Sequence, residues 1–188
     1  MIKTLVITST VREGRSGEKI AKWYLNEAKK TAPNGMELEL LDIAELDLPL
    51  FDQAAPPKMH QYSDVQNKIA EKIGSADAFI FVTGEYNHSI PGALKNFIDY
   101  IYAEWGRKPA AYVGYGTVVG ARAIEHLIQI MAEMGVVSVG RGSDHVTVSA
   151  PWSAIDEDGN VKSDFVHGDI KAQLEELNWY ASALKSAR

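Results

Sequence analysis

The sequence predicts an α/β protein built from three layers, with a parallel β-sheet covered by helices on both faces. Short continuous apolar runs, such as Leu5-Val6-Ile7 and Ala78-Phe79-Ile80-Phe81-Val82, are typical of strands buried on both faces. Segments with apolar residues three and four positions apart separate these runs, as expected for helices that bury one face. The two kinds of segment alternate along the chain, which indicates right-handed βαβ crossovers and a doubly wound sheet.

Each element has its own signal in the sequence. Strands are expected over residues 5–7, 36–41, 78–82, 110–113 and part of 136–148, where apolar residues are continuous or alternate. Helices are expected over residues 17–32, 62–75, 92–102, 118–135 and 167–185. In the first of these, Ala21, Leu25 and Ala28 follow one another at spacings of four and three, which makes one helical face. Two stretches rich in turn residues, 48–62 and 150–164, are expected to be loops.

Composition narrows the class of protein. A chain of 188 residues suits one domain, so residues 1–188 are expected to form a single domain. With 46% hydrophobic and 23% charged residues, intrinsic disorder is excluded, and a net charge of −6 argues against nucleic-acid binding. No apolar run reaches the ~20 residues of a membrane span, and the first residues do not resemble a secretory signal. Because cysteine is absent, thiol and disulfide chemistry are excluded, and a cytoplasmic protein is expected.

The turn after the first strand, residues 8–17, is the first candidate for chemistry. It reads Thr-Ser-Thr-Val-Arg-Glu-Gly-Arg-Ser-Gly and leads into the first expected helix. Helix N-termini carry unpaired N–H groups that attract anions, and hydroxyls together with Arg12 and Arg15 would add donors for a phosphate. The alternative interpretation is that Ser16 caps the helix while the arginines are solvated. The residues alone leave both interpretations open.

Two further turns follow strands at the same edge of the sheet, where parallel sheets bind their ligands. Residues 84–91 could present backbone amides, Asn87 and an aromatic face to a flat polar ring, or form an ordinary turn of Asn and Ser. Residues 114–120 include small residues that permit the close approach of a ligand ring. Their Gly-x-Gly is not a dinucleotide fingerprint, because the third glycine comes one residue late and Glu133 falls inside an expected helix.

Other reaction classes find no support. The five histidines lack metal-ligand spacing, so no metal site is expected. No Gly-x-Ser-x-Gly elbow follows a strand, which disfavours a Ser–His–Asp hydrolase. His88 lies in a candidate ligand loop, where it could face the nicotinamide or the acceptor, but the favoured interpretation is a solvated residue. Lys95 and Asp99, four residues apart on one helix, are interpreted as a structural or subunit-contact pair.

Residues 85–99 carry a resemblance to a known family. The segment Glu85-Tyr86-Asn87-x-Ser89-x-Pro91-Gly92-x-Leu94-Lys95-Asn96-x-x-Asp99 resembles the P-E-Y-N-x-S-x-P-x-x-L-K-N-x-x-D motif of the NADPH-dependent FMN reductase family, which includes flavin, quinone, azo-dye and chromate reductases. The first turn resembles G-S-x-R-x-G-R, and Trp105 to Ala110 together with Tyr115-Gly116 resemble the family's third segment. The resemblance covers almost the whole chain. It implies a flavodoxin-like α/β three-layer sandwich with five parallel strands in the order 2-1-3-4-5.

The resemblance also implies a site for FMN. The residues it assigns to the phosphate are Ser9, Thr10, Arg12, Arg15, Ser16 and Gly17. Those it assigns to the isoalloxazine ring are Glu85, Tyr86, Asn87 and Ser89 on one side, and Tyr115, Gly116 and Thr117 on the other. No catalytic side chain is implied, because the flavin carries the chemistry. Three places depart from the family pattern: Ser9 replaces Gly, Gly84 replaces Pro, and Thr117-Val118-Val119 replaces a Ser and paired Gly.

The activity that the resemblance implies is two-electron transfer. NADPH or NADH would give a hydride to flavin N5, and a quinone, free flavin, azo compound or similar small molecule would then accept the electrons. The protein is expected to be a homodimer or homotetramer, without nucleic-acid or membrane partners. The alternative is a flavin-binding electron carrier or sensor without NAD(P)H turnover. A second alternative is a binding module of the same fold without a cofactor.

Overall fold

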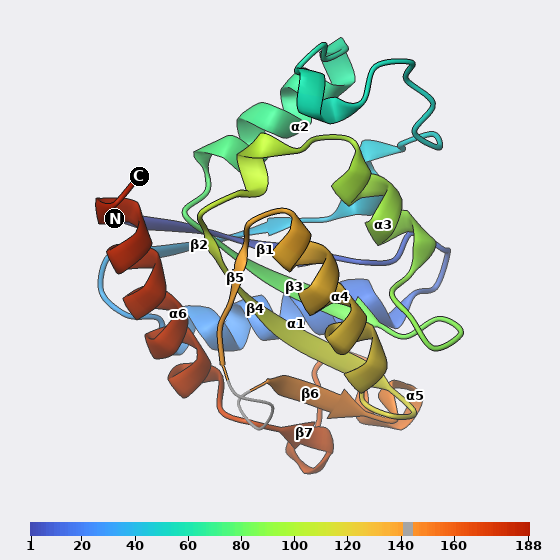
Figure 1. Ribbon diagram of the computed structural model, residues 1–188. Helices are drawn as coiled ribbons and strands as arrows, with labels where there is room; N and C mark the ends of the chain where they lie inside the picture. The colour runs from blue at the N-terminus through green and yellow to red at the C-terminus, as the bar shows by residue number, and fades with distance from the viewer. Residues whose placement is uncertain (141–144) are drawn as a thin grey trace.

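The structure is a computed structural model that describes residues 1–140 and 145–188. Its strands are β1 (Ile2–Thr8), β2 (Met36–Leu41), β3 (Ala78–Gly84), β4 (Pro109–Gly116), β5 (Val137–Ser138), β6 (Val146–Ser149) and β7 (Val166–His167). They form one sheet in the order β2-β1-β3-β4-β6-β7, and β5 also pairs with β4 (Figure 1). The parallel series β2-β1-β3-β4-β6 confirms the predicted order 2-1-3-4-5 and the flavodoxin-like class.

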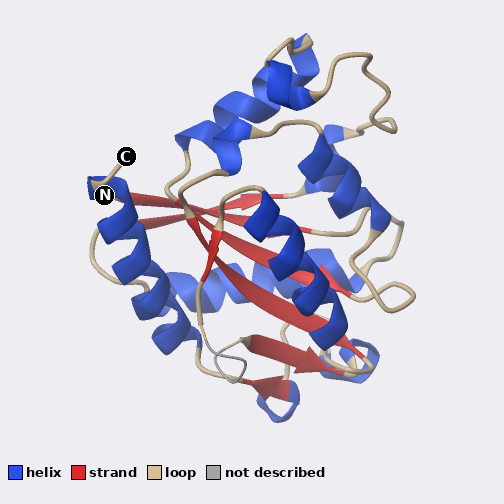
Figure 2. Cartoon of the chain, viewed as in Figure 1, coloured by secondary structure: helices blue, strands red, loops and turns tan. Residues whose placement is uncertain are grey.

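Helices cover both faces of the sheet, as Figure 2 shows. They are α1 (Ser16–Thr31), α2 (Asp64–Ser75), α3 (Gly92–Asp99), α4 (Ala121–Glu133), α5 (Pro151–Ala154) and α6 (Ile170–Ser186), with short 3-10 helices η1 (Ile43–Leu46), η2 (Pro57–Met59), η3 (Ala103–Trp105) and η4 (Ser163–Phe165). Residues of α1 and α6 pack on one face of the sheet, and residues of α2, α3 and α4 pack on the other. These two apolar clusters confirm the predicted three layers. In the described ranges no helix is long and apolar enough to cross a membrane.

The central strands are buried because helices cover them on both sides. Every residue of β3 is buried, whereas in the edge strand β2 only Met36 is buried and the other residues are partly or fully exposed. The buried face toward α2, α3 and α4 includes Trp105, whose ring contacts Phe79 and Phe97 with centroids 5.1 and 5.7 Å apart. The continuous apolar run in the sequence therefore predicted β3 correctly.

Within residues 136–148, where a fifth strand was expected, the described residues form two strands, β5 and β6, and residues 141–144 lie outside the described residues. With β7, the sheet of the described residues has seven strands rather than five. β5 and β6 both lie parallel to β4, at its beginning and its end. The side chain of Gln173 on α6 donates a 2.9 Å hydrogen bond to the carbonyl oxygen of Tyr112 in β4. The seventh strand, β7, adds an antiparallel edge next to β6.

Two helices are shorter than their apolar spacing predicted. The expected helix over 118–135 begins at Ala121, because Val119 and Gly120 adopt φ values of +52° and +70° that a right-handed helix cannot contain. The expected helix over 92–102 ends at Asp99 and is followed by η3. There the carbonyl of Tyr100 accepts a 2.7 Å hydrogen bond from the Gln66 side chain. Apolar periodicity continues through both breaks, so it could not locate them.

Candidate functional site

The turns after β1, β3 and β4 meet at one edge of the sheet. In the parallel register, Thr8 lies opposite Val82 and Gly84 lies opposite Tyr115, so the three strands end side by side. Side chains from the first and third turns extend across this edge and link the three. The sequence analysis expected ligand chemistry at this edge, since parallel sheets bind ligands beyond the carboxyl ends of their strands.

The first turn contributes hydroxyl groups that hold the edge together. Ser9 and Thr10 are both buried. The backbone N–H of Gly84 donates a 3.3 Å hydrogen bond to Ser9 Oγ, and Thr10 Oγ1 lies 3.5 Å from the hydroxyl of Tyr115. These two predicted phosphate residues therefore join β1 to both neighbouring turns, and their hydroxyls face inward.

The N-terminus of α1 is not capped by a side chain of the described residues. Arg15, not Ser16, occupies the N-cap position, and Ser16 is the first residue of the helix. The alternative interpretation of Ser16 as the helix cap is therefore wrong. The first N–H groups of α1 stay available to an anion at the positive end of the helix dipole.

The two arginines of the first turn have different partners. Arg15 is largely buried and forms an ion pair with Asp42, whose carboxylate also accepts hydrogen bonds from Thr8 Oγ1 at 2.8 Å and from the backbone N–H of Ala44 at 3.1 Å. Its Nε has no hydrogen-bond partner among the described residues. Arg12 is exposed, and its Nε donates a 3.0 Å hydrogen bond to the hydroxyl of Tyr86.

The second turn is a tight hairpin with Asn87 and His88 at its centre. Both have positive φ values, +49° and +72°, as in the type I′ turns that join β-hairpins. The backbone groups of Tyr86 and Ser89 exchange hydrogen bonds of 3.0 and 3.1 Å. The turn that Asn and Ser predicted is therefore present, and it leaves the Tyr86 side chain 40% exposed.

Helix α4 holds this hairpin at two points. Arg122 in its first turn forms an ion pair with Glu85, and the Nδ1 atom of His126, one turn further along, lies 3.0 Å from Ser89 Oγ. The sequence analysis did not identify Asp42, Arg122 or His126 as site residues. The spacing of four between Glu85 and Ser89 matches the spacing between Arg122 and His126, but only the fold shows that the two segments face each other.

The third turn places one large side chain beneath the edge. Tyr115 is 7% exposed, and burial raises the pKa of its hydroxyl. A Cβ atom on Gly84 would lie 2.8 Å from the Tyr115 ring, and one on Gly17 would lie 2.5 Å from its hydroxyl oxygen. Glycine is therefore required at both positions for Tyr115 to lie there. Gly116 adopts a φ of +130°, and Thr117 is exposed.

Comparison with known proteins identifies the family. The model of the NADPH-dependent FMN reductase family matches residues 2–148. The chain belongs to the NADPH-dependent FMN reductase family. This confirms the resemblance that the sequence carried, and with it an oxidoreductase class that uses FMN and NAD(P)H.

Some bacterial relatives match this reductase along almost the whole of both chains. It is 31% identical over 198 residues to an NAD(P)H-dependent FMN reductase of Pseudomonas aeruginosa, covering 98% of this chain and 97% of that one. A 2-hydroxy-1,4-benzoquinone reductase of Burkholderia is 28% identical over 195 residues, which cover 100% and 98% of the two chains. The solved flavoenzyme NAD(P)H:(acceptor) oxidoreductase FerB of Paracoccus denitrificans superposes with a TM-score of 0.69 at 24% identity, covering 99% and 98%. That likeness supports the fold.

The residues of the reductase fit a flavin nucleotide. Several buried side-chain polar atoms of the described residues have no hydrogen-bond partner, and three of them lie at this edge: Arg15 Nε in the first turn, Glu85 Oε2 in the second and Arg122 Nε after the third. Unpaired buried polar atoms are rare in folded proteins, because each costs about 1–3 kcal/mol. A ligand with an anionic end and a polar ring could supply their partners, and the uncapped N-terminus of α1 suits the anionic end. In the same described ranges, no group of three or more His, Asp and Glu side chains is placed to hold a metal ion.

Proposed function

We propose that this chain is an NAD(P)H-dependent, FMN-containing oxidoreductase that reduces quinones or similar small two-electron acceptors. The observation that carries the proposal is the edge where the three strand-end turns meet, with a helix N-terminus that no described side chain caps. Membership in the FMN reductase family supports it. The Burkholderia relative is named for its action on a benzoquinone, which supports a quinone as the acceptor.

The phosphate of FMN would bind at the first turn. The first N–H groups of α1 and the side chains of Arg12 and Ser16 are the available donors. Arg15 contributes positive charge, although Asp42 balances part of it. Ser9 and Thr10, with inward hydroxyls, would act mainly by holding the turn against Gly84 and Tyr115.

The isoalloxazine ring would lie between the second and third turns. The hairpin with Tyr86, Asn87 and Ser89 would form one wall, and Gly116 and Thr117 would form the other. Tyr115 lies beneath this position and leaves its hydroxyl on the α1 side, near Thr10. Bound FMN would supply the redox chemistry, a two-electron transfer from NAD(P)H to the acceptor.

The side chains around the ring would position the two substrates. Tyr86 is 40% exposed, and Arg12 holds its hydroxyl in place. An aromatic face fixed in this way offers a surface on which a nicotinamide or quinone ring can stack. Val11 and Val118, which are 51% and 40% exposed, add apolar surface from the first and third turns.

The wider organisation of the reductase remains a prediction. We propose that residues 1–188 act as one flavin-binding domain, and that the protein is a cytoplasmic homodimer or homotetramer. Apolar side chains that such an assembly could cover include Leu50, Met59 and Trp179, which are 82%, 61% and 65% exposed. Light scattering of the purified protein measures the assembly directly.

The activity is tested with the purified protein loaded with FMN. Under anaerobic conditions, NADPH or NADH is expected to bleach the visible absorbance of the bound flavin, and addition of a benzoquinone is expected to restore it. Steady-state oxidation of the nicotinamide should depend on the quinone. If neither NADPH nor NADH reduces the bound flavin, the proposed enzymatic activity is contradicted. An electron carrier or sensor is then favoured.

A further inference from the structure

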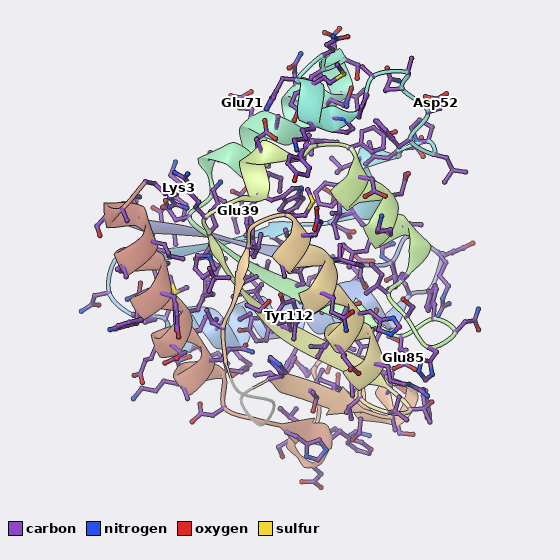
Figure 3. All side chains as sticks on the ribbon, viewed as in Figure 1. Lys3, Glu39, Asp52, Glu71, Glu85 and Tyr112 are labelled. Atoms are coloured by element: carbon purple, nitrogen blue, oxygen red, sulfur yellow. The ribbon has the colours of Figure 1, made fainter. Side chains whose placement is uncertain are left out.

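His88 and His126 place two imidazole rings side by side where the hairpin after β3 meets α4. His88 is a central residue of the hairpin, and His126 lies in the second turn of α4. Their ring centroids are 6.1 Å apart, and the ring planes are inclined at 54°. Figure 3 labels Glu85, where this hairpin begins beside α4. The two rings meet only in the folded chain, so the spacing of histidines along the sequence could not reveal them.

The distance between the rings suits two ligands of one metal ion. Zn²⁺ forms bonds of about 2.0–2.1 Å to histidine nitrogen, so the centres of two rings on one ion lie roughly 5–6 Å apart. The separation of 6.1 Å is close to the upper end of this range. His88 is exposed, and its ring makes no hydrogen bond within the described residues. A small rotation of this side chain therefore brings both rings onto one ion.

Ser89 orients the other ring. His126 is half-buried, and its Nδ1 atom lies 3.0 Å from Ser89 Oγ. When Nδ1 donates its hydrogen to this hydroxyl, the lone pair of the ring is on Nε2, which is then the atom that can bind a metal. Histidines that bind metals in proteins almost always donate their other ring N–H to a neighbouring group, which fixes the ring. The pair thus combines one fixed ring with one that can adjust.

The charges around the pair permit a cation. Arg122 lies one helical turn before His126, but its guanidinium forms an ion pair with Glu85, which balances the positive charge. Glu125, exposed beside His126 in the sequence, adds a negative charge to the same helix. No group of three or more His, Asp and Glu side chains is placed for a metal in the part of the chain that the structure describes. Two histidines leave the other positions of a metal ion to water.

We propose that His88 and His126 bind one divalent late transition-metal ion, Zn²⁺ or Cu²⁺, with water as its remaining ligands. Ions of this class bind imidazole nitrogen, whereas Mg²⁺ prefers oxygen. The bound ion joins the centre of the hairpin to α4 and adds a third link to the two contacts already there. Because the hairpin carries Tyr86, the ion restrains one wall of the proposed flavin site and inhibits turnover. The inhibition rests on the proposed function, but the binding of the metal does not.

Binding is tested by isothermal titration calorimetry of the full chain, without a purification tag, with ZnCl₂. One Zn²⁺ per chain is expected to bind, Cu²⁺ more tightly and Mg²⁺ not at all. Ser89→Ala should weaken Zn²⁺ binding about 10-fold, because it removes the partner that orients His126. His88→Ala and His126→Ala should each weaken it by more, because a ligand itself is lost. His167→Ala removes an exposed histidine of β7 and, as the control, should keep the wild-type affinity.

Hydrogen exchange tests the restraint on the hairpin without flavin and without turnover. The backbone N–H groups of Tyr86 and Ser89 donate to each other's carbonyls at 3.0 and 3.1 Å, so their exchange reports opening of the hairpin. With free Zn²⁺ at about ten times its dissociation constant, the exchange of both amides should slow about 10-fold in the wild type. It should not change in His126→Ala, and circular dichroism checks that this variant is folded.

Three results would overturn the inference. The first is a wild-type protein that binds no Zn²⁺, and the second is Zn²⁺ binding that survives both histidine substitutions. The third is exchange at Tyr86 and Ser89 that Zn²⁺ does not change. Oxidation of NADPH with a benzoquinone should be slowed by Zn²⁺ in the wild type and not in His126→Ala, and equal inhibition of both would exclude this pair as the cause. A protein without any activity would contradict the proposed function, while calorimetry and exchange still decide the metal site.

Discussion

Arg12 and Tyr86 lie 74 residues apart in the chain and are joined by a 3.0 Å hydrogen bond from the arginine Nε to the tyrosine hydroxyl. The bond connects the turn after β1 with the hairpin after β3. Because a guanidinium has five N–H donors, Arg12 can make this contact and still offer other donors to a phosphate. Arg12 therefore belongs to the proposed phosphate site and also fixes the exposed aromatic ring of Tyr86.

Removal of Arg12 is expected to weaken FMN binding. Arg12→Ala should raise the dissociation constant for FMN about 10- to 100-fold, because one charge-assisted contact to the phosphate is lost. Tyr86→Phe, which frees the same guanidinium, should change FMN affinity much less. Fluorescence titration measures both constants, with Lys19→Ala on the exposed side of α1 as the charge-matched control. Unchanged FMN affinity in Arg12→Ala would exclude Arg12 from the phosphate site.

Substitution of Gly17 tests the packing beneath the site. In Gly17→Ala the new Cβ would lie 2.5 Å from the Tyr115 hydroxyl oxygen and 2.6 Å from Thr10 Oγ1, so one of these elements must move. We expect a loss of about 1–3 kcal/mol in the free energy of unfolding, measured with urea. Adding Tyr115→Phe, which removes the nearest atom, should restore part of the loss. The control is Gly92→Ala at the start of α3, where no atom of the described residues lies within 4 Å of the new methyl.

Gln173 is expected to be essential to the core between α1, α6 and the sheet. Its amide donates to the Tyr112 carbonyl at 2.9 Å and accepts from the buried Tyr24 hydroxyl at 2.7 Å. Gln173→Leu leaves both groups unpaired, so unfolding should become easier by about 1–3 kcal/mol for each of them. Gln129→Leu, at an exposed position of α4, should change the unfolding free energy little. Equal effects of the two substitutions would mean that the Tyr112 carbonyl and the Tyr24 hydroxyl find other hydrogen-bond partners when Gln173 is replaced.

Asp77 directly precedes β3, at the end of the strand away from the site. Its ionisation is expected to make the stability of the fold depend on pH. Burial alone would raise its pKa, but hydrogen bonds from Lys185 and the Lys3 backbone, together with the charges of Lys185 and Arg188, lower it below the ordinary value of 3.8. A carboxylate with a lowered pKa stabilises the fold above its ordinary pKa, and this contribution is lost as pH falls through the folded-state pKa.

The measurement compares wild type with Asp77→Asn. At neutral pH the variant should be less stable by about 1.5–3 kcal/mol, because the charge-assisted hydrogen bonds are weakened. The difference in unfolding free energy should shrink as the pH is lowered below 3.8. A difference that stays constant across this range would show that the charge of Asp77 does not contribute.

The central strands could be predicted from local sequence patterns, whereas their order came from the resemblance to the family. The apolar runs at β1 and β3 and the alternation with helices sufficed, because burial on both faces is a property of each segment by itself. The division of β5 and β6 could not be predicted. The hydrogen bond from Gln173 on α6 to the backbone of Tyr112 could not be predicted either, because it joins segments that meet only in the folded chain.

The part of the site at the start of α1 was predictable, because glycine, serine and arginine residues gather there in the sequence. The ion pairs between residues distant in sequence were not predictable. The turn at Asn87 and His88 could be expected from residue type, since these side chains tolerate positive φ. Ser16 resembled a helix cap, yet Arg15 takes that position. The partners Asp42 and Arg122 are distant in sequence from Arg15 and Glu85, so no local spacing could reveal them.

The most direct test of the whole account is an equilibrium titration of the flavin-free protein with FMN and, separately, with riboflavin, which has the same ring but no phosphate. The account predicts one FMN bound per chain, with riboflavin bound at least about 10-fold more weakly because it lacks the contacts with Arg12 and the N-terminus of α1. Equal affinity for the two would contradict the phosphate site, and no binding of either would contradict the account itself.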